Sequence, residues 1–287
     1  EEVIVYSSAR SGSSDIWLTS ADGSTHTQIT SLPGREVGGL LSPDGTEILY
    51  GYRAPGSSGW ELRIVRSDTK DDHAVPDLRS GFPKSWSPEG THFLYSEILG
   101  NWLGSIRIAA RDGRTDDLFM SPFPPYTQLH AQSWRTGTVL ITGHYGHSGN
   151  NRLFTASEDG TNVHPVWGGH SEGGALSPDG RRVAFLSSNR LVVADLDGSN
   201  PEFLLTSGIL RTTRYPFSPD GLKLAMTRLN AGGGMDVYTI DVDSRALTRL
   251  TSLGDIDSVT DWGVIPPSCT YGPEDQPLGF ERANGAP

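Results

Sequence analysis

The sequence contains a single cysteine in 287 residues, Cys269, so it cannot form a disulfide within the chain. It also lacks an N-x-S/T glycosylation sequence, and neither signal identifies the compartment. No apolar run approaches the length that crosses a bilayer, and we expect no membrane insertion. The first residues show neither an initiator methionine nor a signal-peptide pattern, which favours a chain processed or trimmed at its start.

Clusters of positive charge are also missing. The formal net charge is -11, and no run of lysine or arginine occurs, so the long-range field should repel nucleic acid rather than attract it. Glycine (35) and proline (19) are abundant and spread along the chain. That composition is typical of many short strands joined by tight turns, and an all-β chain of this length commonly forms one domain.

One short phrase recurs along the chain. It begins with an apolar residue and continues Ser-Pro-Asp/Glu-Gly, starting at Leu41, Trp86, Leu176 and Phe217. Degenerate copies at Trp134 and Trp262 bring the count to six, with spacings of 41 to 48 residues between leading residues. This period is expected for the four-stranded blades of a β-propeller, and the leading tryptophans should therefore pack in the core.

Each phrase precedes an alternating apolar strand, and an Asp-Gly turn usually follows the next strand. Residues 2–30 supply three strands of a blade that lacks its first strand, while residues 258–264 supply a first strand alone. We therefore predict an all-β, six-bladed propeller over residues 1–265, closed by pairing its N- and C-terminal strands. Residues 266–287 form a Pro/Gly-rich C-terminal tail.

The repeat resembles that of TolB-like propellers over residues 2–264. The similarity is carried by Ile4-Val5-Tyr6-Ser7-Ser8, Ser14-Asp15-Ile16-Trp17, Asp22-Gly23, Gln28-Ile29-Thr30 and Ser42-Pro43-Asp44-Gly45. The resemblance implies a six-bladed ring, periplasmic or secreted, that binds a protein partner on its face. The N-terminal α/β domain of TolB has no counterpart here, and similar repeats occur in peptidase-linked propellers and in polysaccharide lyases.

The turns should lie on one face of the ring, so the loops between strands two and three and between blades should lie on the other. That second face is the usual ligand face in such folds. Its candidate ligand-binding residues are Arg35, Arg79, Trp102, Tyr126, Arg211 and Arg214. The arginines should make this face less acidic than the rest of the molecule.

Histidines gather in the same set of loops. His144 and His147 lie three residues apart in a Gly-rich loop, and together with His130 and His170 they could surround a divalent metal. The alternative is that they are ordinary hydrogen-bonded loop histidines. With Tyr145 and Glu172, these four histidines are also the candidate catalytic residues.

Two hypotheses remain open from the sequence. The first is a non-enzymatic, monomeric scaffold that binds a protein segment or small ligand in the channel face. The second is a secreted polysaccharide lyase or hydrolase, metal-assisted through the histidines, that acts on an oligosaccharide. The sequence Gly169-His170-Ser171-Glu172-Gly173 matches the nucleophile-elbow pattern, but no helix follows it, and we give this match little weight.

Overall fold

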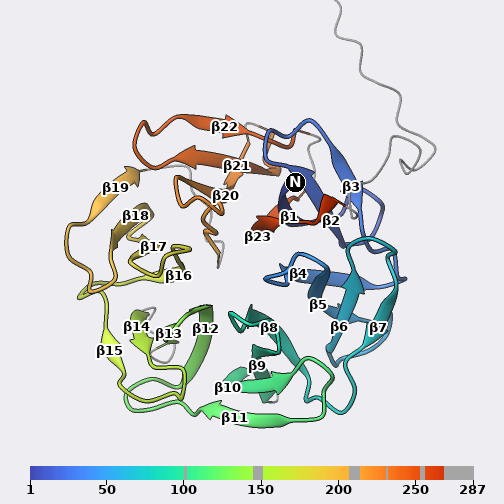
Figure 1. Ribbon diagram of the computed structural model, residues 1–287, viewed down its shortest axis with the longest axis horizontal. Coiled ribbons are helices and arrows are strands. Elements are labelled where there is room, and N and C mark those ends of the chain that lie inside the picture. The colour runs from blue at the N-terminus through green and yellow to red at the C-terminus, as the bar shows by residue number, and fades with distance from the viewer. Residues whose placement is uncertain (100–101, 145–150, 207–213, 231, 253–255, 268–287) are drawn as a thin grey trace, which may run out of the picture.

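A computed structural model describes residues 1–99, 102–144, 151–206, 214–230, 232–252 and 256–267. These residues form antiparallel sheets arranged as blades around a central axis, with the first strand of each blade innermost (Figure 1). Within the described residues no helix is long and apolar enough to span a bilayer. The predicted all-β, six-bladed propeller is confirmed.

The strands divide among six blades in chain order. Blade 1 consists of β23 (Ser258–Val264), β1 (Glu2–Ser8), β2 (Asp15–Ser20) and β3 (His26–Gln28). Blade 2 contains β4 (Arg35–Leu41), β5 (Glu47–Arg53), β6 (Glu61–Arg66) and β7 (Asp72–Ala74). Blade 3 contains β8 (Gly81–Trp86), β9 (His92–Leu99), β10 (Trp102–Ala110) and β11 (Asp116–Met120).

The second half of the ring follows the same plan. Blade 4 contains β12 (Gln128–Arg135), β13 (Thr138–His144), β14 (Arg152–Ala156) and β15 (His164–Pro165). Blade 5 contains β16 (Glu172–Leu176), β17 (Arg182–Ser187), β18 (Arg190–Asp195) and β19 (Glu202–Leu205). Blade 6 contains β20 (Lys223–Leu229), β21 (Met235–Asp241) and β22 (Leu247–Arg249).

Blade 6 has three strands among the described residues, against the predicted four. At the place of its innermost strand, the described residues form an isolated bridge between Phe217 and Leu224. The carbonyl of Pro216, just before this bridge, accepts a bond from the Ala225 N–H at 2.9 Å. Residues 207–213, which lead into the bridge, lie outside the described part.

Ring closure follows the predicted one-plus-three arrangement. Strand β1 pairs with β2 on one side and with β23 on the other, with Ile4 opposite Trp262. Beyond this ladder, Glu1 and Ile265 exchange two bonds of 2.9 Å between backbone nitrogen and oxygen atoms. The two ends of the described chain thus lie side by side, and β1 is paired along both of its edges.

The recurring phrase builds its own turn. In blade 2 the Ser42 hydroxyl donates to the Asp44 carboxylate at 2.6 Å and accepts the Glu47 N–H at 3.0 Å. The same pattern repeats from Ser177 and from Ser218. The phrase is therefore structural, because serine and aspartate hold the chain that leads into the second strand.

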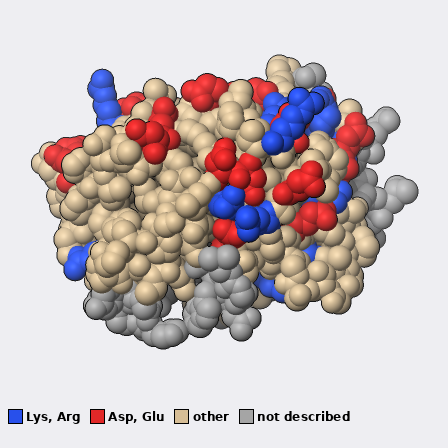
Figure 2. Space-filling model, turned by 90° about the horizontal axis from the view of Figure 1, so that it is seen from below, with Lys and Arg blue, Asp and Glu red and all other residues tan. Residues whose placement is uncertain are grey.

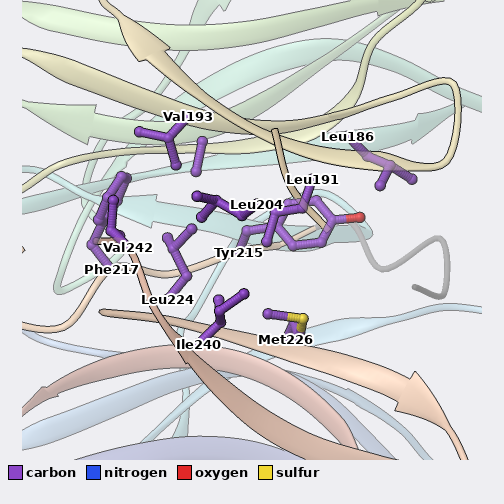
Figure 3. Close-up of a cluster of buried hydrophobic side chains, with 11 residues drawn as sticks. Leu186, Leu191, Val193, Leu204, Tyr215, Phe217, Leu224, Met226, Ile240 and Val242 are labelled. Atoms are coloured by element: carbon purple, nitrogen blue, oxygen red, sulfur yellow. The ribbon is translucent and has the colours of Figure 1, made fainter. Parts of the chain in front are cut away.

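Hydrophobic clusters fill the spaces between neighbouring blades. One joins Leu191, Val193 and Leu204 of blade 5 to Leu224 and Ile240 of blade 6 (Figure 3). Burying each such side chain is worth about 1.5–3 kcal/mol relative to leaving it exposed. The three leading tryptophans are at most 6% exposed, as the repeat predicted.

Candidate functional site

A β-bulge interrupts the innermost strand of five blades and faces residues toward the channel. In blade 3, Pro83 pairs with Tyr95 and Ser85 with Leu94, so Lys84 has no partner across the ladder. Gln132 in blade 4 and Thr260 in blade 1 are bypassed in the same way. Bulges re-aim side chains, and this one recurs two residues before each leading tryptophan. Lys84 is the charged member of that set.

The channel is crossed by a guanidinium. Arg214 enters from blade 6, and its Nη2 donates to the carbonyl oxygens of Pro83 (3.1 Å) and Lys84 (2.7 Å) in blade 3. Blades 3 and 6 are opposite each other in a six-membered ring, so this side chain spans the axis. Arg214 also lines a cavity on each side of this crossing, and burial lowers its pKa to about 10.

We name the two faces by their connections. The turn face holds the Ser-Pro-Asp-Gly and Asp-Gly turns, and the loop face holds the loops between blades. A cavity of about 440 Å³ opens among the turns, with Pro43, Pro88, Pro178 and Pro219 in its wall. A second cavity, of about 390 Å³, is the loop-face cavity, and its residues include Arg35, Trp60, Phe82, Lys84, Arg214 and Ile256.

Charge is distributed unequally between the loop-face cavity and the turn face. Among the described residues, the lining of the loop-face cavity includes three cationic side chains and no aspartate or glutamate. The turn face carries carboxylates whose pKa values are lowered by hydrogen bonds from neighbouring serine or threonine hydroxyls and backbone N–H groups, among them Asp22, Asp159, Asp179, Asp197 and Asp220. The pKa of Asp68 is lowered chiefly by a hydrogen bond from Arg66. Around the rim seen in Figure 2, acidic and basic side chains are interspersed.

Lys84 lies in an unfavourable place for a charge. Burial in the channel, followed by repulsion from Arg214, lowers the pKa of its amine to about 7. No carboxylate of the described chain forms an ion pair with it. The cavity therefore presents an amine that is partly neutral near pH 7.

Two predicted histidines meet beside this lysine. The rings of His130 and His144 are edge to face with their centroids 4.6 Å apart. Burial is the main reason that both pKa values are lowered, and Lys84 contributes in each case. Both imidazoles are therefore neutral near pH 7.

His170 is held in the next blade with Glu172. Its Nδ1 accepts the Asn151 N–H at 3.1 Å, and its Nε2 lies 3.0 Å from Glu172 Oε1. In the neutral ring the proton must then be on Nε2, which donates to the carboxylate. Both ring nitrogens are therefore engaged by protein groups, and His170 offers no free lone pair to a metal.

Part of the predicted metal site lies outside the described residues. Among the described residues, no three His, Cys, Asp or Glu side chains are grouped so that they could hold a metal ion. His147 and Tyr145 lie outside the described residues, as does Arg211.

The other predicted ligand-binding residues are separated. Arg35 is exposed and lines the loop-face cavity with Arg214. Arg79 is paired with Glu97 at 3.3 Å, and Tyr126 packs edge to face on Phe154 with centroids 5.2 Å apart. Trp102 begins β10, and its side chain is outside the described part.

Lys84, Trp60 and Phe82 complete the loop-face cavity but were absent from the predicted binding residues. The rings of Trp60 and Phe82 are in contact, with centroids 4.6 Å apart, and the Arg53 guanidinium lies over Trp60 at 4.9 Å. The offset of two residues before the leading tryptophan is the sequence signal that could have found Lys84. This offset can be used only if the bulge is known, because the alternation of side chains along a regular strand does not single out Lys84.

The closed ring and its channel define a six-bladed β-propeller that is structurally similar to TolB propeller domains. No family model matches the sequence.

Three solved structures illustrate the similarity. TolB from Acinetobacter baumannii aligns with a TM-score of 0.75 at 16% identity, covering 91% of this chain and 66% of that one. This chain thus spans just under two thirds of that TolB. A chain of the nidogen/laminin complex gives a TM-score of 0.65 at 12% identity, covering 91% and 100%. Oligogalacturonate lyase from Vibrio parahaemolyticus gives 0.57 at 14% identity, covering 87% and 74%. At these identities the similarity establishes the fold alone.

Proposed function

We propose that the protein is a non-enzymatic propeller scaffold that binds an acidic protein segment in its loop-face cavity. The observation that carries this proposal is the cavity lining, which includes Arg35, Lys84 and Arg214 and, in the part of the chain that the structure describes, no carboxylate. In a chain with a net charge of -11, such a cluster is a local exception. A cationic recess in a low-dielectric wall attracts and orients an anionic ligand.

Apolar groups at the same cavity favour a peptide over a bare inorganic anion. Trp60 and Phe82 form part of the wall, and Ile256 is 58% exposed beside them. Exposed aromatic and aliphatic side chains next to cations are typical of protein-binding surfaces. The acidic residues of the partner would contact the arginines, and its apolar residues would pack on this wall.

The opposite face is unsuited to such a ligand. Its turns contribute carboxylates that stay ionised at neutral pH because they accept hydrogen bonds within the turns. An acidic segment is therefore repelled there and attracted to the loop face. The nidogen/laminin complex supports a protein partner in one respect, because a chain of that complex has a similar fold.

A pair of charge reversals tests the proposal. Arg35→Glu changes the net charge by the same amount as Arg114→Glu, whose side chain is 86% exposed at an Asp-Gly turn on the other face. We expect Arg35→Glu to weaken binding of an alternating Glu-Gly peptide about tenfold or more, and Arg114→Glu to change it less than about threefold. Isothermal titration at low ionic strength measures both. Equal losses would show that only the overall charge matters and would contradict the site.

The enzyme hypothesis is the second candidate, and one observation favours it. His130 and His144 are neutral bases near Lys84, and a cationic cavity also suits an acidic oligosaccharide such as a polyuronate. The engagement of both nitrogens of His170 weighs against its use in a metal-assisted version. Release of unsaturated product from polygalacturonate, followed by ultraviolet absorbance, would favour the lyase over the scaffold.

The scaffold proposal also includes the oligomeric state and the compartment expected from the sequence. We propose a monomer that acts in the periplasm or outside the cell, without insertion into a membrane. Nucleic acid is not a proposed partner, because the net charge of -11 disfavours binding to a polyanion.

A further inference from the structure

Lys84 occupies an unusual position for a lysine. It lies at a β-bulge of an innermost strand, lines the loop-face cavity, and has a backbone carbonyl that holds the Arg214 guanidinium at 2.7 Å. A lysine on a protein surface keeps its ammonium in water and commonly lies near a carboxylate. Lys84 has neither a carboxylate in the cavity lining nor an ion pair within the described chain.

Burial and the charge of Arg214, which approaches from blade 6, both disfavour the protonated form of Lys84. His130 and His144 lie near Lys84 on blade 4 and bring no negative charge. The buried Asp261 is close enough to Arg214 to favour its charge, but it accepts bonds from the Leu41 and Trp262 N–H groups and does not pair with Lys84. Desolvation beside another cation is the arrangement that makes a lysine amine nucleophilic.

We infer that Lys84 is a site of covalent amine chemistry, which takes small aldehydes or α-keto acids that carry a carboxylate. Arg35 and Arg214 line the same cavity and supply the positive charge that would receive the carboxylate. The cavity volume of about 390 Å³ accommodates a molecule of a few heavy atoms beside the lysine. This inference uses the cavity of the proposed function but does not require that an acidic protein segment binds there.

The reaction needs no oxidant or cofactor. The lone pair of the neutral Nζ attacks the carbonyl carbon, the carbonyl π pair moves to oxygen, and one proton passes from nitrogen to that oxygen through solvent, which gives a neutral carbinolamine. The hydroxyl then takes a proton from solvent and leaves as water while the nitrogen lone pair forms the C=N bond, and the remaining N–H proton returns to solvent to leave the imine. The lowered pKa of Lys84, about 7, means that a large fraction of its amine is ready for the first step at neutral pH.

The sequence makes the test simple because the chain has only three lysines, Lys70, Lys84 and Lys223. The folded protein is incubated with glyoxylate and cyanoborohydride at pH 7, which reduces the imine to a stable secondary amine. Peptide mass spectrometry then gives the labelling rate at each lysine, separately from the amino terminus. We expect Lys84 to be labelled about tenfold faster or more than the half-buried Lys70 and the exposed Lys223, because Lys84 lies in the cationic cavity and the other two lysines do not line it.

Three controls separate the inference from simpler explanations. In urea the three lysines should be labelled at similar rates, and Lys84→Arg should remove only the Lys84 adduct. Propanal, which lacks a carboxylate, should show a smaller preference for Lys84 than glyoxylate does. Binding of the Glu-Gly peptide is measured separately on the unmodified protein, so labelling of Lys84 without peptide binding, or peptide binding without labelling, shows which of the two proposals fails. Labelling of Lys84 no faster than Lys70 and Lys223 in the folded protein would overturn the inference.

Discussion

Replacing Gly45 by alanine is expected to destabilise the whole ring by about 3 kcal/mol or more. Gly45 has a φ of +73°, and a Cβ atom there would lie 2.0 Å from the carbonyl oxygen of Val264. That oxygen belongs to the end of the closing strand, next to the bonds between Glu1 and Ile265. The clash therefore displaces backbone at the seam that completes the propeller.

Gly180 is the matched control for this variant. It occupies the same place in its own Ser-Pro-Asp-Gly turn, has a φ of +69°, and has no atom within 4 Å of the Cβ position. Gly180→Ala should therefore lower the free energy of unfolding only by the cost of holding alanine in the left-handed backbone conformation, about 1–2 kcal/mol. Urea unfolding followed by circular dichroism compares the two. Equal losses would mean that the seam contact contributes nothing.

Deleting residues 1–8 should abolish cooperative folding. The deletion removes β1, which separates β23 from β2, and with it Val3, Ile4, Val5 and Tyr6, all at most 3% exposed. Four buried side chains of this size are worth about 6–12 kcal/mol, which is comparable with the whole stability of an ordinary domain. The loss also bares two strand edges, so the shortened chain should aggregate.

Thermal denaturation of the deletion variant measures this effect, with Glu2→Ala as the control. Glu2 is in the same strand but its side chain is exposed, and its replacement should change the free energy of unfolding by less than about 0.5 kcal/mol. A deletion variant that melts at the temperature of the intact protein would show that closure by β1 is dispensable.

The repeat made the fold accessible from the sequence. The leading residues Leu41, Trp86 and Phe217 each mark the end of an inner strand, and the turns that follow them are held by local serine and aspartate bonds. Local determinants of this kind can be identified without three-dimensional information. The closure of blade 1 followed from counting strands at the two ends.

The candidate site could be predicted only in part. His130 and Glu172 each lie four residues before a leading residue, Trp134 and Leu176, and this register agrees with their positions on the inner strands β12 and β16. Alternation and repeat register do not show that a bulge directs Lys84 into the channel or that Arg214 reaches across to blade 3. They also do not show that a backbone N–H takes the lone pair of His170. These features depend on contacts between segments far apart in the chain.

The guanidinium of Arg214 crosses the channel and lines the inner end of the loop-face cavity. Its Nη2 atom donates to two backbone carbonyl oxygens of blade 3, and these bonds fix the position of the guanidinium in the channel. Its positive charge is then available to both the acidic segment and the small carboxylate ligands proposed above. A preorganised cation of this kind reduces the cost of ordering the site when a ligand binds.

Hydrogen exchange of the protein with and without the acidic Glu-Gly peptide shows directly which face binds. If the loop-face cavity is the site, amides at 35–38, 82–84 and 256–260 should exchange more slowly when the peptide is present. Amides in the turns at 43–45, 88–90, 178–180 and 219–221 should be unchanged, because these turns lie on the opposite face. Protection confined to those turns or to the outer strands of the blades would contradict binding at the cationic mouth of the channel.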